Sequence, residues 1–175
     1  MDNSSKRILR RVVAVISIIV FLFLVYKVWT FYNLSPGKVF RHNYVEYKLD
    51  SLENKNAPSG IEQAYISKNY KEVVQLARSS RNIRDNFLLA HAQVALDNAA
   101  AAVQAFRKVV DMSYVAGGST FKDAAEYNLI LSYILNKDYD LALEQMTKLK
   151  GNPVHQYHDK MTEKLFRQVK MLKWR

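Results

Sequence analysis

The sequence predicts an all-α protein in which one apolar helix near the N-terminus precedes a set of paired amphipathic helices. Three observations lead to this prediction. Residues 12–32 are almost continuously apolar, apolar residues beyond residue 59 recur at helical spacing, and no segment shows sustained two-residue alternation. With only five glycines and three prolines, the chain also lacks the turn residues of an all-β or collagen-like protein.

Composition excludes several classes of protein. The chain has 175 residues, enough for one modest domain, and it has no cysteine. A disulfide scaffold, a thiolate zinc site and cysteine catalysis are therefore excluded. The net charge is +10, but residues 1–32 hold five basic residues and one acidic residue, which leaves 21 basic and 15 acidic residues in 33–175. Such mixed charge does not predict a nucleic-acid partner, which requires concentrated basic residues interleaved with aromatic ones.

The first expected element is a transmembrane helix over Val12–Tyr32. About 20 apolar residues in a helix span a hydrocarbon core about 30 Å thick. Lys27 lies near one end, where its side chain can reach the headgroups, and the aromatic residues there are typical of a membrane interface: Tyr26, Trp29, Phe31 and Tyr32. A buried core helix is the alternative, but no second segment is apolar enough to surround it. A cleaved signal peptide is not favoured, because no small-x-small site follows.

Basic residues before this helix predict its orientation. Residues 1–11 contain four of them against the single acidic Asp2: Lys6, Arg7, Arg10 and Arg11. Because basic residues are retained on the cytoplasmic side, residues 1–11 are expected to form a cytoplasmic tail, with the C-terminal domain periplasmic or otherwise extracytoplasmic. Basic residues on the other side weaken this asymmetry: Lys38, Arg41 and Lys48.

Residues 33–58 are predicted to form a juxtamembrane linker. They contain Pro36, Pro58 and the polar run 51–56, with room for a short helix at about Val39–Leu52. A helical domain is then expected over residues 59–175.

Three helical pairs with short turns are expected to form the first part of this domain. In the first two pairs, Ser59-x-x-Glu62 forms a capping box that starts the first helix. The next three helices are expected at about 70–79, 84–96 and 99–112, from the spacing of their apolar residues.

The third pair follows the loop at Gly117-Gly118-Ser119. Thr120-x-x-Asp123 is expected to cap a helix at about 121–136, and Asp138 to cap the next helix, which ends at Gly151.

A last helix is expected at about 153–174, started by Asn152-Pro153. Its apolar residues form one stripe: Tyr157, Met161, Leu165, Val169 and Leu172. This helix would cap the apolar end of the domain, with a membrane-surface helix as the alternative. Its basic residues form either a solvated face or a contact with anionic lipid: Lys164, Arg167, Lys170, Lys173 and Arg175.

The helical pairs resemble tetratricopeptide (TPR) repeats, which are helix–turn–helix units of 34 residues with interlocking small and large side chains. The residues that match the repeat's packing positions are Leu89, Ala90, Ala102 and Phe106 in the second pair, and Leu129, Tyr133, Tyr139, Ala142 and Met146 in the third. The turn positions Tyr70, Ala99 and Tyr139 are 29 and 40 residues apart, so the repeats are irregular. The chain as a whole is similar to bacterial single-pass proteins with a short cytoplasmic N-terminus and a compact TPR domain outside. This resemblance implies a short α-solenoid of antiparallel helix pairs.

The resemblance also implies where a partner binds. In TPR pairs the first helix lines a concave face, which in this sequence places seven residues there: Arg84, Phe87, His91, Val94, Tyr127, Leu131 and Ile134. We call these the predicted groove residues. They are apolar and aromatic, which suits an extended or helical protein segment better than a carboxylate clamp. Alternatively, some of them simply pack within the domain.

No catalytic or metal-binding motif is found. His155-x-x-His158 has a spacing that can place two imidazoles on one helix face, but two ligands do not complete a site. The chain is therefore expected to be neither an enzyme nor a cofactor protein. We expect a scaffold that holds a protein partner at the inner membrane, through Val12–Tyr32 as its anchor. A subunit of an envelope assembly or secretion complex and a transmembrane regulatory protein remain the alternatives.

Overall fold

The computed structural model describes residues 3–49, 58–117 and 120–175, and all regular elements in these ranges are helices. The polar run 51–56 and the loop residues Gly118 and Ser119 lie outside the described residues, as do the first two residues of the expected basic tail. The chain divides into two compact units, residues 1–35 and residues 36–175. Each is described separately.

The first unit consists of one helix, α1 (Asn3–Asn33). Its segment Arg10–Asn33 is long and apolar enough to cross a membrane, and none of its most apolar part is buried within the chain. The hydroxyl groups of Ser17 and Thr30 donate hydrogen bonds to backbone carbonyl oxygens of the same helix, at 2.9 and 2.8 Å. These two hydroxyl groups therefore have hydrogen-bond partners within the helix itself.

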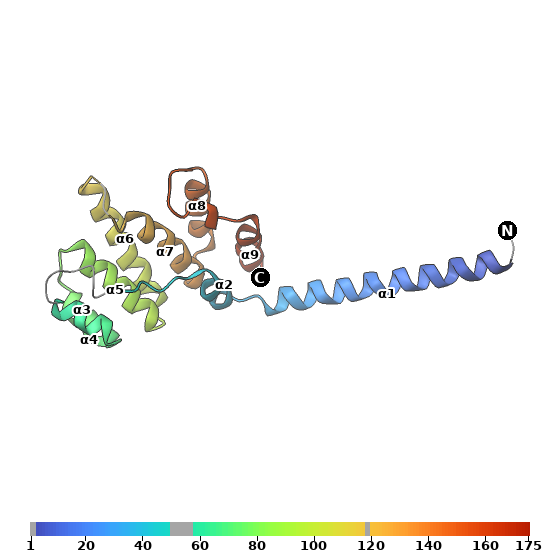
Figure 1. Ribbon diagram of the computed structural model, residues 1–175, viewed down its shortest axis with the longest axis horizontal. Helices are drawn as coiled ribbons and strands as arrows, with labels where there is room; N and C mark the ends of the chain where they lie inside the picture. Colours follow the sequence, from blue (N-terminus) through green and yellow to red (C-terminus); the bar gives the residue numbers. More distant parts are fainter. Residues whose placement is uncertain (1–2, 50–57, 118–119) are drawn as a thin grey trace. The chain divides into compact units, whose positions relative to one another are not determined.

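The second unit begins with α2 (Pro36–Asn43) and contains all the remaining helices (Figure 1). These are α3 (Gly60–Ile66), α4 (Tyr70–Ala77), α5 (Ile83–Ala95), α6 (Ala99–Val115), α7 (Lys122–Leu135), α8 (Tyr139–Lys150) and α9 (Glu163–Lys173). From α3 to α9, each helix packs against the next one along the chain. The expected helices between residues 59 and 151 are all present, with boundaries shifted by at most a few residues.

Three turns in this unit have the same backbone geometry. Lys68, Asp97 and Lys137 lie two residues beyond the ends of α3, α5 and α7, and have positive φ angles of 58°, 56° and 68°. In each turn the N–H of this residue donates to the carbonyl three residues back, and the next N–H donates to the carbonyl five residues back at 2.9 Å. This pair of hydrogen bonds satisfies carbonyl groups at the helix end. The chain therefore reverses direction in the same way three times, between α3 and α4, α5 and α6, and α7 and α8.

Most residues expected to pack between helices do so. Seven of them are buried: Ala90, Ala102, Phe106, Leu129, Tyr133, Ala142 and Met146. Ala102 and Ala142 are completely buried on α6 and α8, where a small side chain lets two helices approach closely. Leu89 and Tyr139 are only half-buried.

The linker predicted over residues 33–58 is not a linker in its first part. Residues 36–49 belong to the second unit, where Val39 and Phe40 of α2 are buried and α2 packs against α7 and α9. The helix expected at Val39–Leu52 instead begins at Pro36 and ends at Asn43. The short helix could not be distinguished from a linker by composition, because its burial depends on helices that lie more than 80 residues further along the chain.

The prediction for the last helix is also wrong in its first half. Residues 151–162 form turns and a short 3₁₀ helix, and α9 starts only after Thr162, whose hydroxyl accepts a hydrogen bond from the N–H of Leu165 at 3.2 Å. Similarly, Phe121 rather than Thr120 occupies the N-cap of α7. The buried part of the expected stripe is Met161, Leu165, Val169 and Leu172, which α8 and α2 cover.

Candidate functional site

The predicted groove residues lie on α5 and α7, and the structure buries six of the seven: Phe87, His91, Val94, Tyr127, Leu131 and Ile134. Arg84 is half-buried, and its Nε lies 2.7 Å from Oε1 of Glu62 in an ion pair. The expectation of an open groove therefore does not hold in this structure, and the alternative of packing within the domain does.

Residues 36–49 cover this surface. The ring of Tyr47 packs edge-on against Phe87, with centroids 5.1 Å apart, and stacks with His91 at 5.9 Å. The hydroxyl of Tyr44 lies 2.7 Å from Nδ1 of His91. In Figure 1, the segment that follows α2 accordingly runs alongside α5 and α7.

Two tyrosines of α3 and α7 hold the backbone of this segment. The hydroxyl of Tyr127 donates to the carbonyl of Asn43 at 2.7 Å, and that of Tyr65 donates to the carbonyl of Tyr47 at 2.9 Å. Burial raises the pKa of Tyr127 to about 12, with a further contribution from Tyr157, so its hydroxyl remains a donor even in alkaline solution near pH 10. Side-chain hydrogen bonds to backbone carbonyls are independent of sequence, which is how a helical scaffold holds an extended chain.

His91 is the buried titratable group at the centre of this surface. Its side chain is surrounded by Tyr44, Tyr47, Phe87 and Phe106, and burial lowers its pKa to about 3. No described residue forms a hydrogen bond with Nε2. The side chain of His91 is therefore a neutral imidazole packed among aromatic rings, with the hydroxyl of Tyr44 as the partner of Nδ1.

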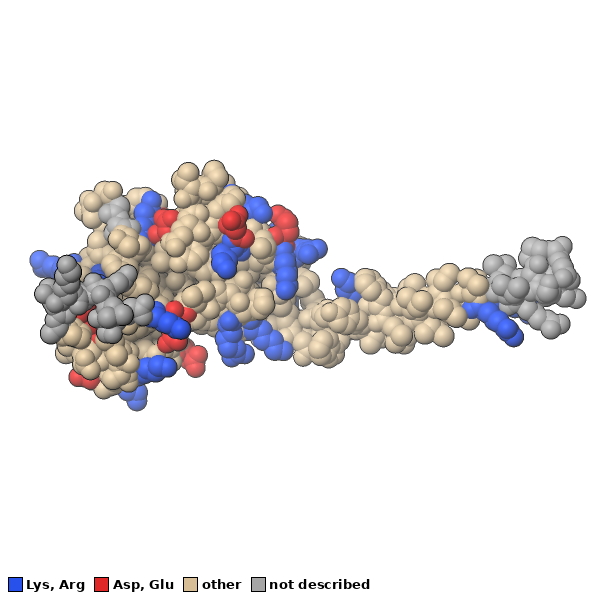
Figure 2. All heavy atoms as spheres, viewed as in Figure 1, with Lys and Arg blue, Asp and Glu red and all other residues tan. Residues whose placement is uncertain are grey.

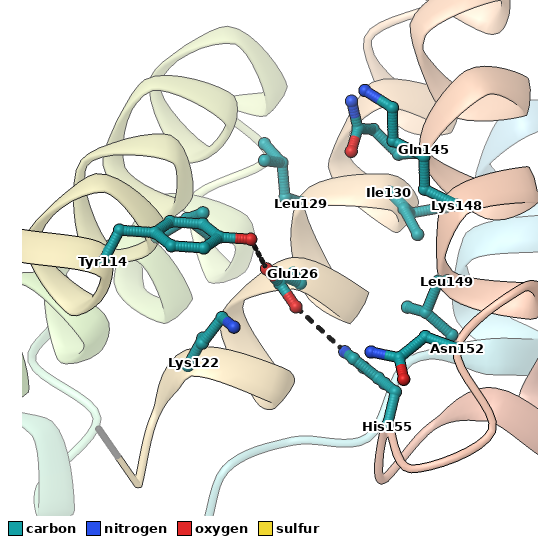
Figure 3. Close-up of a pocket in the computed structure, with 11 residues that line it drawn as sticks. Tyr114, Lys122, Glu126, Leu129, Ile130, Gln145, Lys148, Leu149, Asn152 and His155 are labelled. Atoms are coloured by element: carbon teal, nitrogen blue, oxygen red, sulfur yellow. Dashed lines mark hydrogen bonds and ion pairs between the residues drawn. The ribbon is translucent and has the colours of Figure 1, made fainter. Parts of the chain in front are cut away.

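A second concave surface is open. We call it the outer pocket: it has a volume of about 220 Å³ and lies between α6, α7, α8 and the loop after α8. Its walls combine apolar residues with polar and charged ones: Val110, Tyr114, Lys122, Glu126, Leu129, Ile130, Gln145, Lys148, Leu149, Asn152 and His155 (Figure 3). None of the predicted groove residues is among them.

Glu126 organises one side of the outer pocket. Its Oε1 accepts a hydrogen bond from the hydroxyl of Tyr114 at 2.9 Å, and its Oε2 lies 3.1 Å from Nε2 of His155 (Figure 3). The hydrogen bond between the Tyr114 hydroxyl and Glu126 is the main cause of the raised pKa of Tyr114. The ammonium group of Lys122 lies 4.5 Å from the centroid of the Tyr114 ring. These contacts connect α6, α7 and the loop after α8.

His155 is held in a tautomer that does not suit a metal ligand. Asp123, Glu126 and His155 bring three potential ligand atoms within 4.8 Å of one another. However, Nδ1 of His155 accepts a hydrogen bond from the backbone N–H of Tyr157 at 3.1 Å, so the ring proton of the neutral imidazole is on Nε2 and points to Glu126. A metal-bound imidazole normally donates its second N–H instead. Hydrogen bonding explains this cluster without a metal.

His158 does not join His155 as the sequence spacing suggested. It lies in the 3₁₀ helix His158–Lys160, whereas His155 is buried in the preceding turn, so the two residues do not share a helix face. Sequence reasoning also missed Glu126 and Tyr114, because nothing near either residue in the sequence indicates a pocket.

No protein-family model matches this chain, and no curated protein or solved structure is detectably similar to it.

Proposed function

We propose that this chain is a membrane-tethered protein-interaction module, in which a TPR-like helical scaffold holds a partner close to the bilayer. The observation that carries the proposal is the threefold repetition of one turn geometry, together with packing of each helix on its neighbour. Solenoid proteins have this nearest-neighbour organisation, and binding is their usual role. The apolar segment Arg10–Asn33 supplies the tether.

The covered groove is a poor site for this partner. A partner segment would have to displace residues 36–49, in which Val39 and Phe40 are buried. It would also have to break the hydrogen bonds that this segment forms with His91, Tyr65 and Tyr127. A covalently attached competitor acts at an effective concentration of about millimolar or higher. The partner is therefore assigned to the outer pocket, which needs no displacement.

The walls of the outer pocket suit a protein segment with an apolar side chain and an acidic group. Leu129, Ile130 and Leu149 supply apolar surface, while Lys122 and Lys148 lie at the polar part of the lining. Lys148 is largely exposed, and its ion pair with Glu144 on the same helix is open to solvent. Exposed pairs of this kind contribute little stability, so a partner carboxylate can replace Glu144 at small cost.

Site-specific photocrosslinking in native membranes tests this function. A photoreactive amino acid replaces Gln145, which lines the outer pocket, and in a matched control it replaces Gln75, which is exposed on α4. We expect one adduct of discrete mass from position 145 and none from position 75. Lys148→Glu should weaken the adduct severalfold, because it repels an acidic partner, whereas Lys71→Glu should not.

Two results of the crosslinking experiment would contradict the proposal. If position 145 yields no adduct, or the same mixture of adducts as position 75, the outer pocket is not a partner site. If the adduct survives Lys148→Glu unchanged, the acidic partner chemistry is wrong even though the site is right.

A further inference from the structure

Helix α9 has one buried face and one strongly basic face. Leu165, Val169 and Leu172 face the domain, and Lys164, Arg167 and Lys170 are exposed. At 100° per residue, Arg167, Lys170 and Trp174 lie opposite the buried face. Trp174 is 87% exposed, although an indole normally finds an apolar environment. The apolar face of α9 is occupied by the domain, so α9 does not resemble a helix that inserts its apolar face into a membrane. Its exposed side instead combines basic residues with a tryptophan, two residue types that favour the headgroup region.

Helix α2 extends this basic face. It packs against α9 and exposes Lys38 and Arg41, with no acidic residue along its length. Together with Lys164, Arg167, Lys170, Lys173 and Arg175, the two elements present seven basic residues. In Figure 2, lysine and arginine side chains lie over the part of the domain that α2 and α9 form, with a few acidic side chains among them. We call these seven residues and Trp174 the basic surface.

Three basic residues of α9 are not neutralised within the described part of the chain. The acidic residue of α9, Glu163, pairs with Lys150 at 3.3 Å rather than with the basic surface. Lys173 pairs with Asp140. Lys164, Arg167 and Lys170 form no ion pair with any residue that the structure describes. The basic surface therefore has charge available for an anionic partner.

The chain itself limits how far the basic surface lies from a membrane. Only Leu34 and Ser35 separate the end of α1 from the start of α2, and the three residue steps from Asn33 to Pro36 reach about 10 Å at most. If α1 spans a bilayer, the start of α2 lies among the headgroups, and α9 packs against α2. The basic residues of α2 are therefore close in sequence to the apolar helix, and α2 packs against α9 within the second unit.

We propose that the basic surface binds the anionic phospholipid headgroups of the membrane that anchors the chain, with Trp174 at the interface. This inference rests on the membrane helix of the proposed function. Anionic leaflets attract basic residues within a Debye length of their surface, and tryptophan prefers the headgroup region. The contact restricts the orientation of the tethered domain and so determines which of its faces a partner can reach.

Fluorescence of Trp174 in reconstituted full-length protein tests this proposal. The chain has two tryptophans, Trp29 and Trp174, so Trp29→Phe leaves Trp174 as the only reporter. The protein is inserted into vesicles of brominated phosphatidylcholine, alone or with about one third phosphatidylglycerol. We expect quenching of Trp174 to be about twofold stronger in the anionic vesicles, and the difference to disappear at high salt.

Two triple variants with the same change of net charge provide the control. Lys164→Gln, Arg167→Gln and Lys170→Gln together should abolish the lipid dependence of quenching. Lys68→Gln, Lys71→Gln and Arg78→Gln, which alter exposed residues of the α3–α4 hairpin, should preserve it. Circular dichroism of each variant checks that the helices are intact.

Flotation of the vesicles after carbonate washing separates the possible failures. If the protein floats but quenching of Trp174 is the same in both membranes, the basic surface does not bind anionic lipid. The same conclusion follows if both triple variants lose the lipid dependence of quenching equally. If the protein does not float in either membrane, the membrane helix and the proposed function fail, and the lipid contact fails with them.

Discussion

At the scale of single residues, His91, Tyr127 and Glu126 are titratable groups whose side chains make contacts within the domain. His91 is 2% exposed and neutral, and Tyr127 is buried, has a raised pKa and donates to a carbonyl. Glu126 has both oxygens engaged, by Tyr114 and His155. These residues hold segments of the chain together.

The lowered pKa of His91 predicts that acid destabilises the domain. Between the folded value of about 3 and the unfolded value of about 6.5, the unfolded chain binds a proton that the folded chain does not, so stability falls as the pH falls through this window. From pH 7 to pH 5 we expect a loss of about 2 kcal/mol from this group. Denaturant titrations of the full chain in detergent solution, at both pH values, measure it.

Two variants identify His91 as the source of this effect. His91→Phe preserves the aromatic packing and should remove most of this pH dependence. His42→Gln, which changes an exposed histidine of α2, should leave it intact. A pH dependence that persists in His91→Phe would contradict the assignment.

At the scale of elements, residues 36–49 form an integral part of the helical domain. They contribute α2 and the segment with Tyr44 and Tyr47, and they fill a surface that helices α5 and α7 alone would expose. A truncated chain that begins at residue 59 would therefore expose Phe87 and the apolar residues around it. Exposed apolar surface of that kind promotes aggregation.

Phe40→Ala should destabilise the domain strongly if α2 is an integral part of it. Phe40 is buried and stacks on Tyr44 with centroids 4.8 Å apart, so we expect the free energy of unfolding to fall by about 3 kcal/mol or more. Arg41→Ala, on the exposed face of the same helix, should change it by less than about 0.5 kcal/mol. Denaturant titrations compare the two. Equal and small effects would mean that residues 36–49 are a linker after all.

At the scale of the whole molecule, the proposals depend on which side of the membrane the domain occupies. The basic tail predicts that residues 1–11 are cytoplasmic and that the domain is not. This orientation decides which proteins can reach the outer pocket and which leaflet can face the basic surface.

Cysteine labelling is a direct measurement of this orientation, because the chain has no cysteine of its own. In intact spheroplasts, a membrane-impermeant maleimide should label Gln75→Cys, which is exposed on α4, without permeabilisation. Ser4→Cys should be labelled only after the membrane is permeabilised. The reverse pattern would place the domain in the cytoplasm, and the positive-inside prediction would be wrong.

The sequence alone determined the features that depend on neighbouring residues. The apolar helix follows from a continuous run, and the start of α3 follows from the capping box, in which Ser59 accepts from the N–H of Glu62 and the Glu62 carboxylate accepts from the N–H of Ser59. Helix boundaries from α3 to α8 followed from spacing and turn residues in the same way. These interactions lie within a few residues, so their pattern is visible along the chain.

Only the tertiary structure decided which surface is open. The groove is closed by hydrogen bonds between residues 47 and 84 positions apart, Tyr44 with His91 and Tyr127 with Asn43. The late start of α9 accompanies the burial of His155 against Glu126, 29 residues earlier. Apolar periodicity shows that a face is buried but not what buries it, because burial is non-directional and any apolar segment of suitable size can supply it. The groove, the outer pocket and the basic surface therefore became visible only when distant segments were placed together.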